Sequence, residues 1–240
     1  MQSKNIFIFT FLIFMSSCSA KIISSVEYLN QSAYPTGCES VTTVMCLRYH
    51  KINISVSDFI DEYLKKGEIY IKDGIKYGPH PNNKFIGSPY DKNSYGCYSS
   101  LIEKTIIKIL EDRGSSKDFV VENLDNFPLR TMKKYIDYDI PIIFWATIEF
   151  LPAYVKESNT WIIEETGEKF TWTSNEHCLL LIGYDDNRHV YYFLDPWNNN
   201  GLIEKDIDLV EVRHKEQFSM AVAVVPKNLN LKIKKYNNNI

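Results

Sequence analysis

Residues 177–197 read HCLLLIGYDDNRHVYYFLDPW, and this stretch decides the fold. Two apolar runs, 178–184 and 190–194, flank a short polar segment, which predicts two antiparallel strands joined as a hairpin. Pro196 ends the second run, because it holds Asp195 in an extended backbone and cannot continue a strand ladder. The hairpin therefore places His177 and Asp195 at the same end of neighbouring strands.

The segments around this hairpin predict an α+β domain. Apolar residues at helical spacing, with capping side chains and a Pro at a helix start, indicate helices over about 38–50, from about 55 to near 67, 99–112, 128–138 and 206–216. Further strands are expected over 142–148, 161–163, 169–172 and 220–225. Because most helices precede a mainly antiparallel sheet, the order favours α+β over a doubly wound α/β fold. Residues 67–96 are interpreted as a long irregular loop, which in a compact domain is usually functional.

The first twenty residues form a different kind of segment. Lys4 precedes the apolar run 6–15 and a group of small residues, which is the pattern of a signal peptide. The run is shorter than the roughly 20 apolar residues that a membrane span needs. Ser16-Ser17-Cys18 resembles a bacterial lipobox, so lipidation of Cys18 and cleavage after Ala20 are both open. We expect an exported protein, secreted or lipid-anchored on the outer face of the membrane, whose folded part begins at about Ile22.

Composition and charge limit the classes of protein to which the chain can belong. The chain has 240 residues, 45% of them hydrophobic, which is enough for one domain with a substantial core. The net charge is −3 and the basic residues are dispersed, which argues against a nucleic-acid partner. Four cysteines follow the leader and could form two disulfides, Cys38, Cys46, Cys97 and Cys178. Cys46 and Cys178 lie in apolar segments, however, and using Cys38 for chemistry leaves an odd number, which argues against a disulfide scaffold.

Cys38 follows the turn Tyr34-Pro35-Thr36-Gly37 and begins a helix. The unpaired N–H groups and the dipole at that end stabilise a thiolate, although a lone cysteine is more often a small buried hydrophobe. Nucleophilic catalysis also needs a base and a group that orients it, and His177 and Asp195 supply both. The polar residues 173–176 lead us to expect His177 at the sheet edge rather than in the core.

Each of these residues also has an ordinary structural interpretation. A histidine at a strand start is commonly a surface residue, and Asp-Pro is a common turn pair. The other four histidines are placed less favourably for catalysis: His50, His80, His189 and His214. A metal site at His177 and Cys178 is disfavoured, because adjacent strand residues point to opposite faces.

Four motifs together resemble the papain-like cysteine peptidases related to the bacteriocin double-glycine-leader peptidases, a C39-like family. They are residues 34–41, 85–90 with 95–98, 177–186 and 195–197. The resemblance implies a papain-like fold, and the peptidase domain is expected over 21–228, between the leader over 1–20 and the polar tail over 229–240. It also implies Cys38 as nucleophile, His177 as base and Asp195 as orienting carboxylate. Gln31 would be the oxyanion-hole donor, one residue farther from the nucleophile than in papain-like enzymes, with Asn30 as the alternative.

The expected function is that of an exported, monomeric cysteine peptidase that forms a thioester acyl-enzyme with a peptide or protein substrate and uses no cofactor or metal. Two alternatives keep the fold. One is a non-catalytic module that binds peptides or cell-wall fragments, and the other is an amidase or transglutaminase type of acyl transfer. The aromatic residues of 67–96 either line the substrate cleft or pack on one another.

Overall fold

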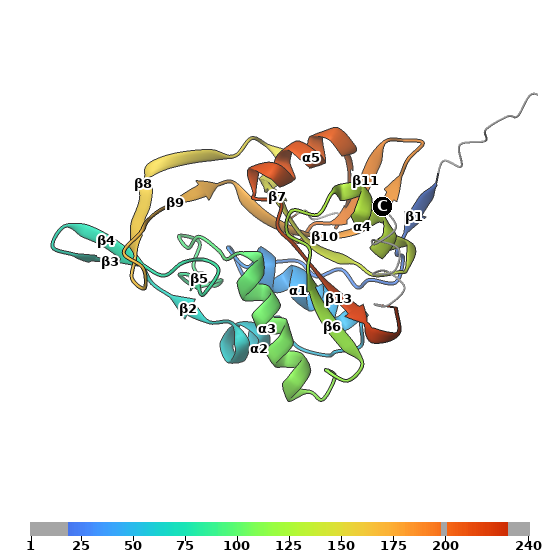
Figure 1. Ribbon diagram of the computed structural model, residues 1–240, viewed down its shortest axis with the longest axis horizontal. Coiled ribbons are helices and arrows are strands. Elements are labelled where there is room, and N and C mark those ends of the chain that lie inside the picture. Colours follow the sequence, from blue (N-terminus) through green and yellow to red (C-terminus); the bar gives the residue numbers. More distant parts are fainter. Residues whose placement is uncertain (1–18, 198–200, 230–240) are drawn as a thin grey trace, which may run out of the picture.

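The computed structural model describes residues 19–197 and 201–229, and its centre is a seven-stranded sheet (Figure 1). Six strands follow the order β12-β11-β10-β7-β13-β6, and β1 also pairs with β10. Every pair in this sheet is antiparallel, so the predicted α+β class is confirmed. The strands are β1 (Ala20–Ile22), β6 (Phe119–Asn123), β7 (Ile142–Thr147), β10 (Glu176–Asp185), β11 (Val190–Leu194), β12 (Leu202–Asp206) and β13 (Ala221–Pro226).

The predicted hairpin is present as β10 and β11. Leu180 pairs with Leu194 and Asp185 with Val190, so the polar turn closes the ladder where the sequence indicates. β10 is buried almost throughout because it lies between β11 and β7 and carries helix α1 (Cys38–Tyr49) on one face. The central strand thereby fixes the position of His177, near its first residue.

The helices cover both faces of the sheet (Figure 1). On β7, the Phe144 ring stacks on His214 of α5, with ring centroids 4.0 Å apart. The next residue, Trp145, donates from its indole nitrogen to the carbonyl of Cys97, just before α3, at 3.2 Å. Successive strand residues point to opposite faces, so α5 and the start of α3 lie on opposite sides of β7. The helices are α1 (Cys38–Tyr49), α2 (Val56–Asp58), α3 (Ser99–Asp112), α4 (Leu129–Asp137) and α5 (Ile207–Glu216), with a π-helical turn η1 (Phe59–Tyr63) and a 3-10 turn η2 (Ile148–Phe150).

Helix α1 is the most deeply placed helix. Residues 38–47 are buried on all sides. Thr42 donates from its hydroxyl to the carbonyl of Cys178 on β10 at 3.0 Å, which ties the helix to the central strand. Because a helix buried all round cannot rotate without burying different side chains, this packing fixes Cys38 at its first position.

The expectation of an irregular loop over 67–96 is wrong in part. The segment contains four short strands, β2 (Lys66–Gly67), β3 (Tyr70–Lys72), β4 (Ile75–Gly78) and β5 (Phe85–Ile86). β3 and β4 join β8 (Tyr154–Ile163) and β9 (Lys169–Ser174) in a second sheet, which extends away from the main sheet (Figure 1). Strands of two to four residues show no local period, and distant partners define them.

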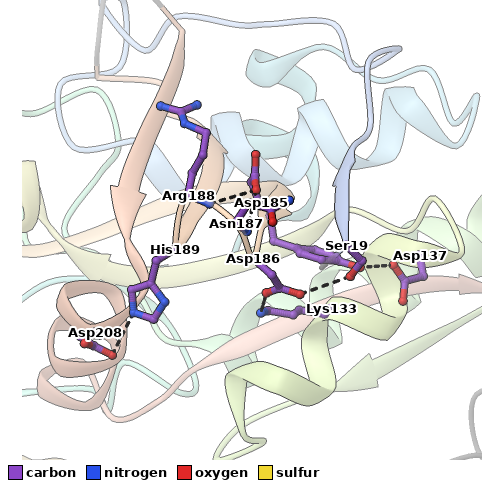
Figure 2. A network of polar contacts seen from close by, with 10 residues as sticks. Ser19, Lys133, Asp137, Asp185, Asp186, Asn187, Arg188, His189 and Asp208 are labelled. Carbon is purple, nitrogen blue, oxygen red and sulfur yellow. Dashed lines mark hydrogen bonds and ion pairs between the residues drawn. The ribbon is translucent and has the colours of Figure 1, made fainter. Parts of the chain in front are cut away.

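The fold begins earlier than the expected Ile22. β1 pairs Ala20 with Asp185 and Ile22 with Gly183. Figure 2 shows Ser19 beside Asp186, to which its hydroxyl donates at 3.2 Å. Most of the predicted leader and nearly all of the predicted tail, residues 1–18 and 230–240, lie outside the described residues. Among residues 19–197 and 201–229, no helix has the length and apolar character of a membrane span.

Candidate active site

Cys38 is the first residue of α1 and follows a tight turn. The amide of Gly37 donates to the carbonyl of Tyr34 at 2.8 Å. A Cβ at Gly37 would lie 2.6 Å from the Cβ of Tyr34, so this approach requires glycine. No side chain caps the helix start, and the first amide with an intrahelical partner is that of Val41, which donates to Gly37. The N-terminal end of α1, where Cys38 lies, therefore presents unpaired amide donors of the kind that stabilise an anion.

His177 and Asp195 are in direct contact. Nε2 of His177 lies 2.7 Å from Oδ1 of Asp195. The same oxygen accepts from the amide of Trp197 at 2.9 Å. With Nε2 directed to the carboxylate, Nδ1 is the ring nitrogen left for a reacting group. The hairpin thus brings together the two residues that its sequence placed at one end.

The expected exposure of His177 is wrong. The side chain is 2% exposed and Asp195 is also buried. His177 pairs with Ala146 of β7 within the ladder, so it lies inside the sheet rather than at its edge. Ser174 and Glu176, which belong to the polar stretch on which that expectation rested, are buried as well. Strand β9 of the second sheet runs almost directly into β10, and its residues Trp172 and Ser174 line the same cavity as His177.

Cys38, His177 and Gln31 line one cavity of about 230 Å³. Its walls include three aromatic side chains, those of Tyr95, Trp172 and Trp197. A larger cavity, of about 660 Å³, lies between η1 and α3 and contains none of the predicted site residues. Chemistry rather than size therefore identifies the candidate site.

Of the two predicted oxyanion donors, Gln31 is the one that lines this cavity. Its side chain is buried, and Nε2 lies 3.4 Å from the carbonyl of Pro35 while Oε1 has no partner among the described residues. Asn30 is exposed and donates to the hydroxyl of Tyr28 instead. The weak bond of Gln31 leaves its amide available for another acceptor.

Two buried carboxyl groups, which the sequence interpretation missed, lie against Cys38. The thiol of Cys38 donates to Oε2 of Glu39 at 3.3 Å, and Oε1 of Glu39 accepts from the amide of Cys97 at 2.6 Å. Cys38, Glu39 and Glu176 each offer an atom within 4.8 Å of the others. A Cβ on Gly96 would lie 2.6 Å from one carboxylate and 3.0 Å from the other, so glycine makes room for the pair.

The electrostatics of this cluster oppose a free thiolate. Burial raises the pKa of Glu39 to about 7, and burial followed by the charge of Glu39 raises that of Glu176 well above its usual range. Burial, followed by the charges of Glu39 and Glu176, also raises the pKa of the Cys38 thiol. The helix start alone favours a thiolate, but desolvation and two acidic neighbours outweigh it here.

The same cluster has the spacing of a metal site, yet its chemistry fits protons better. Metal ligands must be deprotonated, whereas burial favours the neutral forms of all three groups. A second group of suitable spacing, His189, Asp206 and Asp208, is fully exposed. We therefore interpret the buried cluster as a proton-bearing one.

Most of the other histidines, cysteines and aromatic residues considered from the sequence lie in the packed interior rather than at the cavity. His214 contacts the carbonyl of Trp145 through Nδ1 at 2.8 Å, and burial lowers its pKa to about 4. Burial likewise lowers the pKa of His50 to about 4. The four cysteines of the described residues are buried free thiols, Cys38, Cys46, Cys97 and Cys178. Of the aromatic residues in 67–96, Tyr95 lines the cavity, whereas Phe85 belongs to the core.

Comparison with known proteins gives one family and one fold. The Peptidase C39 like family matches this chain over residues 23–220. A crystal structure from Bacillus anthracis, which carries the provisional description of a C39-like peptidase, superposes with a TM-score of 0.72. The two sequences are 23% identical, and the match covers 87% of this chain and 98% of the other. No curated protein matches the sequence.

Proposed function

The chain belongs to the peptidase C39 like family, and we propose that it is a cysteine peptidase with Cys38 as nucleophile, His177 as base and Asp195 as orienting group. The observation that carries this proposal is the 2.7 Å contact between His177 and Asp195, both buried, at the cavity that Cys38 lines. A buried imidazole held by a carboxylate beside a thiol is the arrangement that nucleophilic catalysis requires.

In the proposed reaction, His177 takes the proton of the Cys38 thiol through Nδ1, and the sulfur attacks the carbonyl carbon of a peptide bond. The oxyanion that forms accepts hydrogen bonds from the Cys38 amide and from Nε2 of Gln31. The imidazolium then gives its proton to the leaving amine, and the C–N bond breaks to leave a thioester. Water, deprotonated by His177, attacks the thioester and releases the acid and the thiol. Asp195 keeps Nε2 protonated and stabilises the imidazolium.

The cavity also supports an extended substrate. Its volume of about 230 Å³ suits one or two side chains, and Trp172 and Tyr95 provide apolar walls. The neighbouring hollow between Asn30 and Trp197 continues along the surface from Gln31 and Pro35, which line both. A chain that lies across both hollows would pass Cys38, which lines the first of them. We therefore favour peptide hydrolysis over the transfer of a small acyl group.

The test is turnover of a defined peptide library, followed by mass spectrometry, for the native protein and two pairs of variants. Cys38→Ala and His177→Ala should lose cleavage, whereas Cys46→Ala and His189→Ala, which change the same residue types outside the cavity, should retain it. Full cleavage by Cys38→Ala or His177→Ala would refute the proposal. Peptide binding without cleavage by the native protein would favour the binding module instead.

We also propose that the protein is exported as a lipoprotein, with the leader removed before Cys18 rather than after Ala20. The support comes from Ser19, whose carbonyl accepts from the amide of Asp186 at 3.0 Å and whose hydroxyl contacts that of Tyr184 at 3.2 Å. Cleavage after Ala20 would remove both contacts and shorten β1. Cys18 itself lies outside the described residues.

The position of β1 also determines how far the cavity would lie from a membrane anchor at Cys18. β1 pairs with the end of β10 at Gly183–Asp185, eight residues from His177, or roughly 26 Å along a strand. An anchor at Cys18 would thus hold the cleft away from the bilayer. Mass spectrometry of the N-terminal peptide from a membrane fraction checks this: we expect a lipidated Cys18, and Cys18→Ala should release the protein. A mature chain that begins at Lys21 would contradict it.

A further inference from the structure

The buried pair Glu39 and Glu176 lies where the nucleophile must lose its proton. Glu39 accepts a hydrogen bond from the Cys38 thiol at 3.3 Å, and the backbone of Cys178 also hydrogen-bonds the sulfur. The other oxygen of Glu39 is held by the amide of Cys97, so the carboxyl group cannot turn away from the thiol. Glu176 precedes His177 on β10 and has one buried oxygen, Oε1, without a partner among residues 19–197 and 201–229.

Two carboxylates this close, without a basic partner in the cluster, do not both ionise. The groups that face Glu39 are Cys38 from α1, Cys97 from the segment before α3, and Glu176, His177 and Cys178 from β10. Of these groups only His177 can carry positive charge, and Asp195 already pairs with it. The pair therefore shares a proton, as two carboxyl groups in one buried site generally do.

We propose that Glu39 is a further catalytic residue that acts directly on the Cys38 sulfur, and that Glu176 is a positioning residue that keeps a proton on Glu39. When Glu39 carries the proton, Oε2 donates to the thiolate and stabilises the pair with the His177 imidazolium. When that proton is lost to solvent, the carboxylate repels the thiolate, His177 returns its proton to the sulfur, and the neutral thiol donates to Oε2. The change releases one proton and leaves the nucleophile inactive.

This inference rests on the proposed function for its consequence, but not for its test. It gives the acid pair a role in the reaction: the peptidase is active while Glu39 is protonated and is suppressed when Glu39 ionises. A purely structural pair would stabilise the fold without affecting how the reactivity of Cys38 depends on pH. The two interpretations therefore differ in a quantity that requires no substrate.

The experiment measures the rate of Cys38 alkylation by iodoacetamide between about pH 5 and pH 9, quantified on the Cys38 peptide by mass spectrometry. For the native protein we expect the rate to fall about tenfold as the pH rises through neutrality. Glu39→Gln should abolish this fall, because its amide donates to the sulfur at every pH. Glu176→Gln should move the fall about one pH unit lower, because it removes the coupling through which ionisation of one carboxyl group opposes that of the other. Glu157→Gln, at an exposed position of β8, is the matched control and should change neither the size of the fall in rate nor its midpoint pH.

A fall that persists in Glu39→Gln with an unchanged midpoint would overturn the proposal, and so would a native rate that simply rises with pH. If Glu39→Gln does not fold, as judged by circular dichroism, the midpoint in Glu176→Gln decides between a shift, which supports the proposal, and no shift, which overturns it. Loss of the peptidase proposal would appear separately, as peptide turnover that survives in Cys38→Ala. The two failures can therefore be distinguished.

Discussion

Acidic residues at the two ends of β10 lie in opposite environments, one partly exposed and the other buried. At the hairpin end, Asp185 accepts from the amides of Asn187 and Arg188, and Asp186 pairs with Lys133 and Ser19 (Figure 2). These carboxylates are partly exposed, and each has donors of its own. At the other end, Glu176 is 7% exposed, has an unpartnered oxygen and lies within 4.8 Å of a second carboxyl group.

The difference separates groups that stabilise the fold from groups that carry a function. Partly exposed carboxylates with donors keep their charge and contribute modestly. Glu176 is buried and its Oε1 has no partner among the described residues, which is destabilising, so the sequence retains it at the expense of stability. Such residues are concentrated where the proposed nucleophile and base meet. Substitutions near each end of β10 test this difference.

The largest effect is expected at Asp195. Asp195→Ala leaves Nε2 of the buried His177 without its acceptor, so the ring loses its orientation and the imidazolium its counter-charge. We expect kcat/KM for a cleaved peptide to fall by about 10²–10³-fold. Asp195→Asn keeps an oxygen acceptor without the charge and should lie between this variant and the native enzyme. Equal losses in both variants would show that the charge alone matters.

The next effect is expected at Gln31. Gln31→Ala removes one oxyanion donor and should lower kcat by about 10–100-fold while KM changes little, because the donor acts on charge that develops in the transition state. Asn30→Ala is the matched control, since Asn30 is exposed and directed to Tyr28. A loss of kcat in Asn30→Ala with none in Gln31→Ala would reverse the assignment.

The hairpin end of β10 was predictable from the sequence, because its signals are local. Apolar runs of five to seven residues separated by a polar turn specify β10 and β11 without knowledge of any other segment. The start of α1 at Cys38 was predictable for the same reason, from the turn before it. Family motifs then gave Gln31 a role that its residue type alone would not.

The other end of β10 depends on distant partners and was not predictable in the same way. Glu176 is buried against Glu39, Gly96 and β7, and the short β1 and β12 add to the sheet only through pairing with β10 and β11. A glutamate in a polar stretch indicates a surface position unless those partners are known. The available signal was adjacency: Glu39 follows Cys38 and Glu176 precedes His177 in the sequence.

A third prediction compares the two ends through stability. Glu176 has a raised pKa in the folded chain, so its favourable contribution is complete below its unfolded pKa and is lost as the pH rises through the folded one. Glu176→Gln should therefore match the native protein in acid and exceed its free energy of unfolding by about 1–3 kcal/mol at alkaline pH. Urea denaturation at several pH values measures this. His50 and His214, whose lowered pKa values destabilise the fold as the pH falls below about 6.5, cancel in the difference.

The smallest effect is expected at the hairpin end. Lys133 of α4 pairs with Asp186 and lies over the rings of Tyr184 and Tyr191, at 5.0 and 5.5 Å from their centroids. Because this pair is partly exposed, Lys133→Ala should lower the free energy of unfolding by at most about 1 kcal/mol and should leave kcat unchanged. Lys133→Met, which keeps the stem over the rings without the charge, separates packing from electrostatics, and the electrostatic part should shrink in high salt. A loss of turnover in either variant would show that the two ends of β10 are coupled, and that the hairpin end also positions His177.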